Sequence, residues 1–206
     1  MSPSRLRVFG FLAAGCLASV TAAAAELTPE DWAKIARGDV IVRSLPAGEA
    51  AAGRVWAAVL IPAPVSTVWN VMLDVEHAPE FVPGLRRARR IERHGPSEII
   101  EHTVKYSWLL PEVTYRFRAD YRPQEQIDFQ RISGDLRALT GTWTLRPTPD
   151  GTGTVVTYSV MLDPGFLVPQ WLVRQSLAHN LPAVLRATRQ RATAPPPSPA
   201  GDPRPR

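Results

Sequence analysis

Residues 168–191 constrain the fold most strongly, because they predict one long helix close to the C-terminus. Pro169 suits the first turn of a helix, where its missing N–H leaves no hydrogen bond unmade. At about 100° per residue, one broad stripe collects the apolar side chains of this segment. That stripe consists of Leu167, Trp171, Leu177, Ala178, Leu181, Val184 and Leu185. A helix of this kind must pack its apolar face against another layer of the structure.

Two residues break the amphipathic pattern of this helix. Pro182 removes a helical hydrogen bond to the carbonyl of Ala178 and therefore predicts a kink. Arg174 falls within the apolar stripe, where a buried guanidinium needs a partner. That partner could be a carboxylate or phosphate on a ligand or a carboxylate of the protein, or the side chain could reach solvent at a cavity mouth. We therefore expect the helix to cover a cavity.

Both ends of the chain are expected to lie outside the globular domain. Residues 1–25 resemble a secretory signal peptide, with two arginines before an apolar stretch and an A-x-A cleavage site at its end. The expected location is therefore the periplasm or the outside of the cell, with a lipid anchor at Cys16 as the alternative. Residues 193–206 are rich in proline and are expected to form a disordered tail.

Charge and cysteine content exclude several classes of protein. A formal net charge of +5 on 206 residues is too small to indicate nucleic-acid binding, and the arginines at 86–93 are expected to lie on a solvated strand face. Cys16 is the only cysteine and lies in the predicted leader, so the mature chain has no thiol nucleophile. The sequence also lacks H-E-x-x-H and Gly-x-Ser-x-Gly motifs. We expect no catalytic residue, no metal site and no cofactor.

Between the two ends, hydrophobic patterning predicts a short helix and strand in residues 26–53 and a main domain at residues 54–192. Alternating apolar residues predict strands, and the short turns between them make neighbouring strands antiparallel. Helices are predicted at 29–36, from a cap at Ser66 to residue 73, and, as a broken helix, within 74–84. Strands are predicted at 39–44, 54–61, 85–93, 98–109, 113–121, 126–132, 136–145 and 154–162.

The long helix is the only predicted element that could cover one face of this sheet. We therefore predict an α+β fold in which a curved antiparallel sheet wraps around the long C-terminal helix. Two short helices follow the first main strand. The predicted inner faces of the strands are rich in aromatic side chains, which either line a pocket or fill a core.

Two segments resemble motifs of the START-like superfamily (SRPBCC), which includes polyketide cyclase/dehydrase and lipid transport proteins and a coenzyme Q-binding branch. They are IPAPVSTVWNVMLD at 61–74, which resembles the family's strand-to-helix connection, and EFVPG at 80–84, which resembles its F-x-P turn. The resemblance covers residues 54–191. It implies a helix-grip fold with a hydrophobic cavity between sheet and long helix that holds a lipid, an isoprenoid or a polyketide-like molecule.

The residues expected to contact a ligand combine the aromatic strand faces with the helix. They are His102, Tyr106, Trp108, Tyr115, Phe117, Trp143, Trp171, Arg174, Leu177 and Leu181. A second set comes from apolar loops and is expected to form the cavity mouth and to touch a membrane transiently, unless these loops pack on one another. This set consists of Phe81, Leu109, Leu110 and Phe166.

The sequence therefore favours a monomeric, non-enzymatic carrier of a hydrophobic small molecule. Two alternatives remain at this stage. A cyclase or aromatase acting on a bound polyketide would need a polar cluster deep in the cavity, for which His102, Arg174 and Tyr106 are the candidates. An interaction module would instead have a core filled by its own side chains and no void of ligand size.

Overall fold

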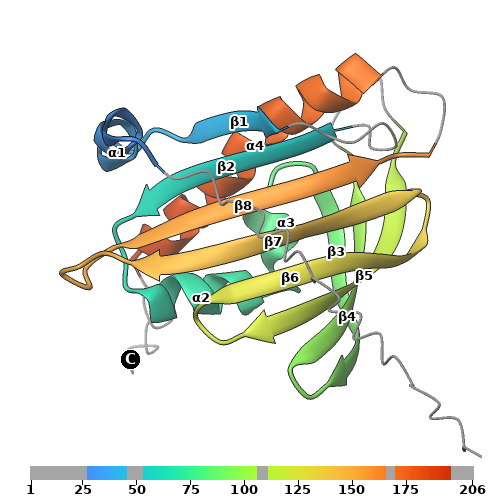
Figure 1. The fold of residues 1–206 in the computed structure, drawn as a ribbon. Helices are drawn as coiled ribbons and strands as arrows, with labels where there is room; N and C mark the ends of the chain where they lie inside the picture. The colour runs from blue at the N-terminus through green and yellow to red at the C-terminus, as the bar shows by residue number, and fades with distance from the viewer. Residues whose placement is uncertain (1–26, 46–52, 106–110, 166–169, 196–206) are drawn as a thin grey trace, which may run out of the picture.

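The computed structural model describes residues 27–45, 53–105, 111–165 and 170–195 (Figure 1). The predicted leader and most of the predicted tail lie outside these residues, so both stay predictions.

Eight strands form one antiparallel sheet in the order β1-β2-β8-β7-β6-β5-β4-β3. The strands are β1 (Ile41–Leu45), β2 (Gly53–Ile61), β3 (Leu85–His94), β4 (Ser97–Val104), β5 (Val113–Arg122), β6 (Gln126–Gly134), β7 (Ala138–Pro147) and β8 (Thr154–Asp163). β2 pairs with β8 along its whole length, which joins the first long strand to the last. In Figure 1 the sheet curls strongly and does not close, because β1 and β3 each have one neighbour.

The helix α4 (Gln170–Thr193) crosses the inner face of the curled sheet, behind β2 and β8 in Figure 1. The short helices α2 (Val65–Leu73) and α3 (Ala78–Phe81) lie on the same side. Side chains from α2, α4 and the inner faces of the strands belong to one continuous apolar core. The predicted helix-grip fold of class α+β is therefore confirmed.

The N-terminal helix α1 (Pro29–Ala36) is capped by Thr28. The Asp31 N–H donates to the Thr28 hydroxyl at 3.2 Å, and the Thr28 N–H donates to the Asp31 carboxylate at 2.9 Å. This reciprocal pair satisfies two N–H groups that the first turn leaves without helical partners. Arg43 of β1 forms an ion pair with Asp31 and lies over the ring of Trp56 in β2. The cap therefore also joins α1 to the edge of the sheet.

Replacing Thr28 with alanine is expected to lower the free energy of unfolding by about 1 kcal/mol, because it removes the side-chain acceptor of the helix cap. Urea titration measures this change. Thr193→Ala is the matched control, since its exposed hydroxyl donates only to carbonyls of its own helix, those of Arg189 at 2.9 Å and Gln190 at 3.4 Å. Equal effects of the two substitutions would show that the capping box contributes nothing measurable.

The start of α2 differs from the prediction. The cap is Pro64 and not Ser66, since α2 begins at Val65. The ring of Pro64 fixes φ at −56°, and its ψ of 150° keeps the residue extended, while its carbonyl accepts the N–H groups of Thr67 and Val68. A backbone acceptor thus starts this helix without a side-chain cap.

The helix α4 continues through Pro182, as one helix from Gln170 to Thr193. Its buried face shifts around the helix between the two halves. Val173 is buried near the N-terminus with Leu177 half-buried, whereas Leu181 and Leu185 are buried in the C-terminal half. The apolar stripe predicted for the whole helix matches the buried face of its C-terminal half. In the N-terminal half the same stripe includes positions that are exposed in the structure.

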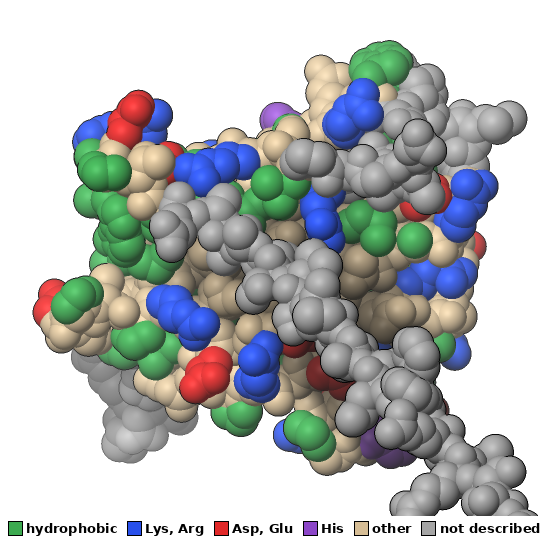
Figure 2. Space-filling model, viewed as in Figure 1, with side chains coloured by type: hydrophobic (Ala, Val, Ile, Leu, Met, Phe, Trp, Pro, Cys, Tyr) green, Lys and Arg blue, Asp and Glu red, His purple; other side chains and the backbone are tan. Residues whose placement is uncertain are grey.

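On the outer face of the sheet, positively and negatively charged side chains are interspersed (Figure 2). Arg89 and Arg116 both bind the carboxylate of Glu101, with nitrogen–oxygen distances of 2.7 and 2.8 Å. Arg118 lies 3.0 Å from Asp120. Arginines of β3 and β5 are thus partly neutralised by carboxylates of β4 and β5, which is consistent with a solvated strand face.

Candidate functional site

In the part of the chain that the structure describes, two cavities lie between the sheet and the helices. The larger has a volume of about 180 Å³ and is bounded by α2, α3, the C-terminal half of α4 and strands β3 to β8. The smaller has a volume of about 100 Å³ and lies between the N-terminal half of α4 and strands β4, β5, β7 and β8. An apolar cavity of about 150 Å³ is enough to bind a small aromatic molecule. The void contradicts the alternative of a core filled by its own side chains.

Four residues line both cavities, and we call them the waist: Tyr115, Leu139, Tyr158 and Val184. They come from β5, β7, β8 and α4, so three strands and the long helix meet at this point. The two cavities therefore share one wall of side chains.

Aromatic rings form a large part of the wall of the larger cavity. The rings of Trp143 and Tyr158 stack with centroids 3.7 Å apart and planes 6° from parallel. The ring of Phe129 lies 6.0 Å from Tyr158 and 6.1 Å from Phe117. It also lies directly over Gly141 of β7. Rings held in this way present large apolar surfaces to whatever enters the cavity.

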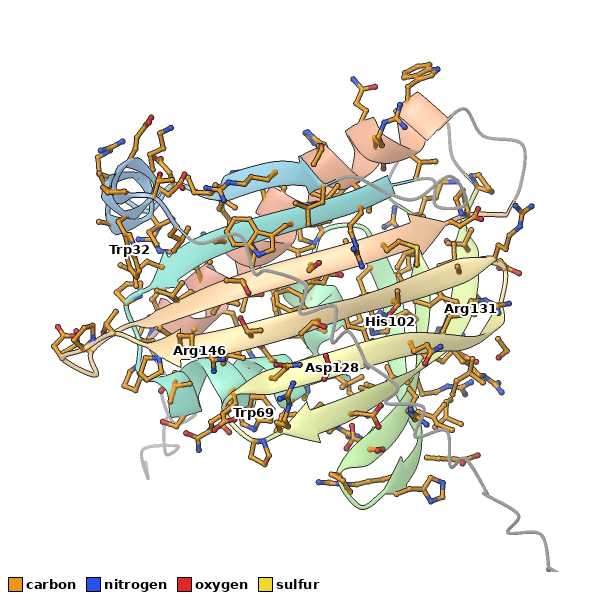
Figure 3. All side chains as sticks on the ribbon, viewed as in Figure 1. Trp32, Trp69, His102, Asp128, Arg131 and Arg146 are labelled. Atoms are coloured by element: carbon orange, nitrogen blue, oxygen red, sulfur yellow. The ribbon has the colours of Figure 1, made fainter. Side chains whose placement is uncertain are left out.

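His102 is a polar side chain within this aromatic wall (Figure 3). Its ring makes edge contacts with Phe117, at a centroid distance of 4.9 Å, and with Tyr115, at 5.9 Å. Neither ring nitrogen has a hydrogen-bond partner among the described residues. Burial lowers the pKa of His102 to about 4. The residue is half-buried and lines the cavity, so its remaining accessible surface faces the void, and it is neutral at neutral pH.

A charged cluster lies next to the larger cavity and reaches it through Tyr121. We call it the Glu98 cluster, and it consists of Glu98, Arg90, Arg93 and Tyr121. Glu98 is only 3% exposed. Its carboxylate lies 2.9 Å from Arg90 Nε and 3.5 Å from Arg93 Nε, and the Tyr121 hydroxyl donates to it at 3.0 Å. Burial, followed by the nearby Glu98 carboxylate, raises the pKa of Tyr121. Only Tyr121 of this cluster lines the cavity.

The Glu98 cluster also fixes the connection between α2 and α3. Arg90 donates to the carbonyl of Leu73 at 3.2 Å and lies 3.2 Å from the Glu76 carboxylate. The sequence analysis did not identify Glu98, although the alternation of β4 gives the signal. Glu98 shares the inward phase of Ile100 and His102.

The structure places most described members of the predicted ligand set on the cavities. His102, Phe117 and Trp143 line the larger one, Leu177 and Leu181 line the smaller one, and Tyr115 lines both. Lining residues that the sequence analysis missed include Phe129, Leu139, Tyr158, Asn180 and Val184. Phe129, Leu139 and Tyr158 could have been found only by pairing strands in register, because each looks like an ordinary core residue in the sequence. Asn180 and Val184 lie on α4 and depend on the path of that helix over the sheet.

Two predicted ligand contacts do not face the cavities. Trp171 is 60% exposed, Arg174 is also exposed, and neither lines either void. Their expected inward orientation is wrong, because the packed face of α4 shifts in its N-terminal half. His102 and Arg174 are therefore not brought together.

Five predicted site residues lie outside the described residues, so their roles stay predictions: Tyr106, Trp108, Leu109, Leu110 and Phe166. Phe81, which was grouped with the mouth, lines the larger cavity from α3, and the guanidinium of Arg191 lies 5.7 Å from its ring centroid. Phe81 is thus next to the last turn of α4.

Within the described ranges, none of the helices combines the length and the hydropathy needed to cross a membrane. The same part of the chain contains no cluster of three or more side chains suited to hold a metal ion.

Comparisons with known proteins agree with this geometry. Residues 61–189 match the family model described as polyketide cyclase / dehydrase and lipid transport. No curated protein sequence matches the chain.

Three solved structures illustrate the structural similarity. The Zhui aromatase/cyclase from Streptomyces sp. R1128 has a TM-score of 0.60 at 18% identity, covering 74% of this chain and 94% of that one. A STAR-related lipid transfer protein from Xanthomonas axonopodis has a TM-score of 0.67 at 16% identity, covering 75% and 94%. Human STARD10 has a TM-score of 0.62 at 14% identity, covering 76% and 70%. At these identities the similarity shows the fold alone.

Proposed function

This chain belongs to the polyketide cyclase / dehydrase and lipid transport family, and we propose that it binds one hydrophobic small molecule between its sheet and α4 and carries it unchanged. The observation that carries this proposal is the pair of apolar cavities that meet at the waist. Pockets for small molecules are mostly apolar, with a few polar groups that orient the ligand. Both cavities have that composition, and their polar side chains are those of His102, Ser176, Asn180, Thr188 and the tyrosines.

A carrier is favoured over a cyclase by the arrangement of the polar side chains. A cyclase was expected to combine His102 with Arg174 and Tyr106. Arg174 is exposed and lines neither cavity, and Tyr106 lies outside the described residues. The buried carboxylate of Glu98 is paired with arginines and with the Tyr121 hydroxyl. General acid–base catalysis needs a titratable group within hydrogen-bond reach of the substrate. Glu98 lines neither cavity, and His102 lines the larger one with no carboxylate beside it among the described lining residues.

We further propose that the carrier acts in the periplasm or outside the cell, because residues 1–25 have the pattern of a signal peptide. Cell fractionation of a tagged full-length chain tests this location. Recovery of the uncleaved chain in the cytoplasm would contradict it.

Binding is tested with N-phenylnaphthylamine, a neutral probe whose fluorescence rises in apolar surroundings. We expect saturable binding to the wild-type chain. Val184→Trp places a large side chain at the waist and is expected to weaken binding by about tenfold, equivalent to about 1.4 kcal/mol. Ala178→Trp is the matched control, because it adds the same side chain to an exposed position of the same helix. Circular dichroism verifies that both variants are folded.

Equal affinities of the two variants, or no saturable binding to the wild type, would contradict the proposed site. Mass spectrometry then distinguishes carrier from enzyme. A molecule extracted from the purified native protein should be recovered with unchanged mass after prolonged incubation with it. Conversion of that molecule would favour the cyclase.

A further inference from the structure

The charge of the cavity walls limits the chemistry of the ligand. Among the described residues that line the two cavities, none carries a carboxylate, a guanidinium or an ammonium group. A charged head group placed there would lose its hydration and gain no counter-ion. Burying an ion without a partner costs several kcal/mol.

The charges of the Glu98 cluster, next to Tyr121, do not change this conclusion, because they are already paired. In the Glu98 cluster, the buried carboxylate has Arg90, Arg93 and the Tyr121 hydroxyl around it. Arg90 in turn also binds Glu76. A ligand cation or anion would have to separate Tyr121 from Glu98 to reach these groups.

The polar atoms that do face the cavities are mostly committed to the protein. The Tyr121 hydroxyl donates to Glu98, and the Thr188 hydroxyl donates to the Val184 carbonyl at 3.0 Å. The Asn180 amide donates to the carbonyl of Ser176 at 2.8 Å. His102 differs, because no described residue hydrogen-bonds to either of its ring nitrogens. A neutral imidazole offers one donor and one acceptor, and burying these without partners is costly.

We infer that the ligand is electrically neutral and carries a hydroxyl or carbonyl oxygen that hydrogen-bonds to the imidazole of His102 in the larger cavity. This inference rests on the proposed function and names the class of molecule that the same site takes. A hydroxyl group can accept from one imidazole nitrogen or donate to the other, and a carbonyl can accept. Alcohols, ketones and esters with an extended apolar body fit this description, whereas fatty acids, alkyl amines and phosphate esters do not.

The experiment measures displacement of N-phenylnaphthylamine by four molecules with the same alkyl chain: decanol, methyl decanoate, decanoate and decylammonium. At neutral pH the first two are uncharged. We expect both to displace the probe, and the two ions to be weaker competitors by at least about 100-fold, as unpaired burial of a charge requires. Equal displacement by decanoate or decylammonium would overturn the inference, because it would place the head group in water or beside a counter-ion.

A variant tests the contact with the imidazole. His102→Phe keeps the ring contacts with Tyr115 and Phe117 and removes both nitrogens. We expect it to weaken competition by decanol by about fivefold, the effect of one neutral hydrogen bond, and His102→Gln to restore part of this. His94→Phe is the control, since His94 is exposed at the end of β3. Unchanged competition in His102→Phe would overturn the assigned contact.

The two proposals fail in different ways. If neither the probe nor any competitor binds, the proposed function is wrong and this inference with it. If the probe binds and is displaced without regard to charge, only this inference is wrong.

Discussion

Replacement of Gly141 by alanine is expected to lower the free energy of unfolding by about 3 kcal/mol, at the upper end of the cost of overpacking a core. A Cβ atom at this position would overlap the carbonyl oxygen of Ser159 in β8 and the ring edge of Phe129 in β6. The carbonyl belongs to the strand pairing, and the ring is held between Phe117 and Tyr158. Neither can move away without disturbing its neighbours, so the added methyl group must separate strands or push the ring into the larger cavity.

Urea unfolding measures the stability, and probe titration measures the cavity. Gly153→Ala is the matched control, because that glycine is buried but its Cβ would approach no heavy atom closer than 3.2 Å. We expect the control to cost much less. In a Phe129→Leu background, the penalty at Gly141 should shrink, since part of the overlap is removed. A cost equal to that of the control would show that the packing around Phe129 is looser than the structure indicates.

Acidification is expected to remove about 3 kcal/mol of stability through His102 alone, given about 1.4 kcal/mol per unit of pKa shift. Burial lowers the pKa of His102 from 6.5 to about 4 in the folded protein. Between these values the unfolded chain binds a proton that the folded chain does not. Unfolding therefore becomes easier as the pH falls. The contribution of His102 is complete above pH 6.5 and is lost progressively down to about pH 4.

Other groups also titrate in this range, so the contribution must be isolated by comparison. Hydrogen bonds to Arg116 and Arg89 lower the pKa of Glu101, for example, and that shift also favours unfolding at low pH. His102→Phe keeps a ring of similar size and removes the titration. Its stability should fall less steeply than that of the wild type between neutral pH and about pH 4. Parallel curves for the two proteins would contradict a buried, neutral His102.

The fold could be predicted from the sequence because its elements have strong local patterns. Alternation in β4, β5 and β7 identifies inward positions such as His102, Phe117 and Trp143, and the connection at 61–74 indicates where α2 begins to within two residues. The face of α4 could not be predicted as well. Its buried side shifts along its length, and only the path of the helix over the sheet determines that Trp171 and Arg174 lie outside.

The shape of the site depends on strand pairing between segments that are far apart in the sequence. Local sequence patterns do not reveal such pairing. Leu139 and Tyr158 come to line the same cavities as Tyr115 only through the order of the strands in the curled sheet. In the sequence, Gly141 is one position of an alternating strand. Its role, to leave room for the ring of Phe129, is evident only in the structure. The alternation of β4 gives Glu98 an inward position, but the side chains that bind its carboxylate are identified only when β3 and β5 lie beside β4.

The shared wall of the two cavities has a consequence for how this chain could diverge. A substitution at the waist alters both chambers at once, because Tyr115, Leu139, Tyr158 and Val184 border each of them. A substitution at His102 borders only the larger chamber, and one at Asn180 borders only the smaller. The functional groups that the protein accepts at the two ends of a bound molecule can therefore be altered separately. Substitutions at the waist instead change the length and the width of the molecule that the two cavities accept. Relatives that share the waist but differ at His102 should accept molecules of similar outline with different functional groups.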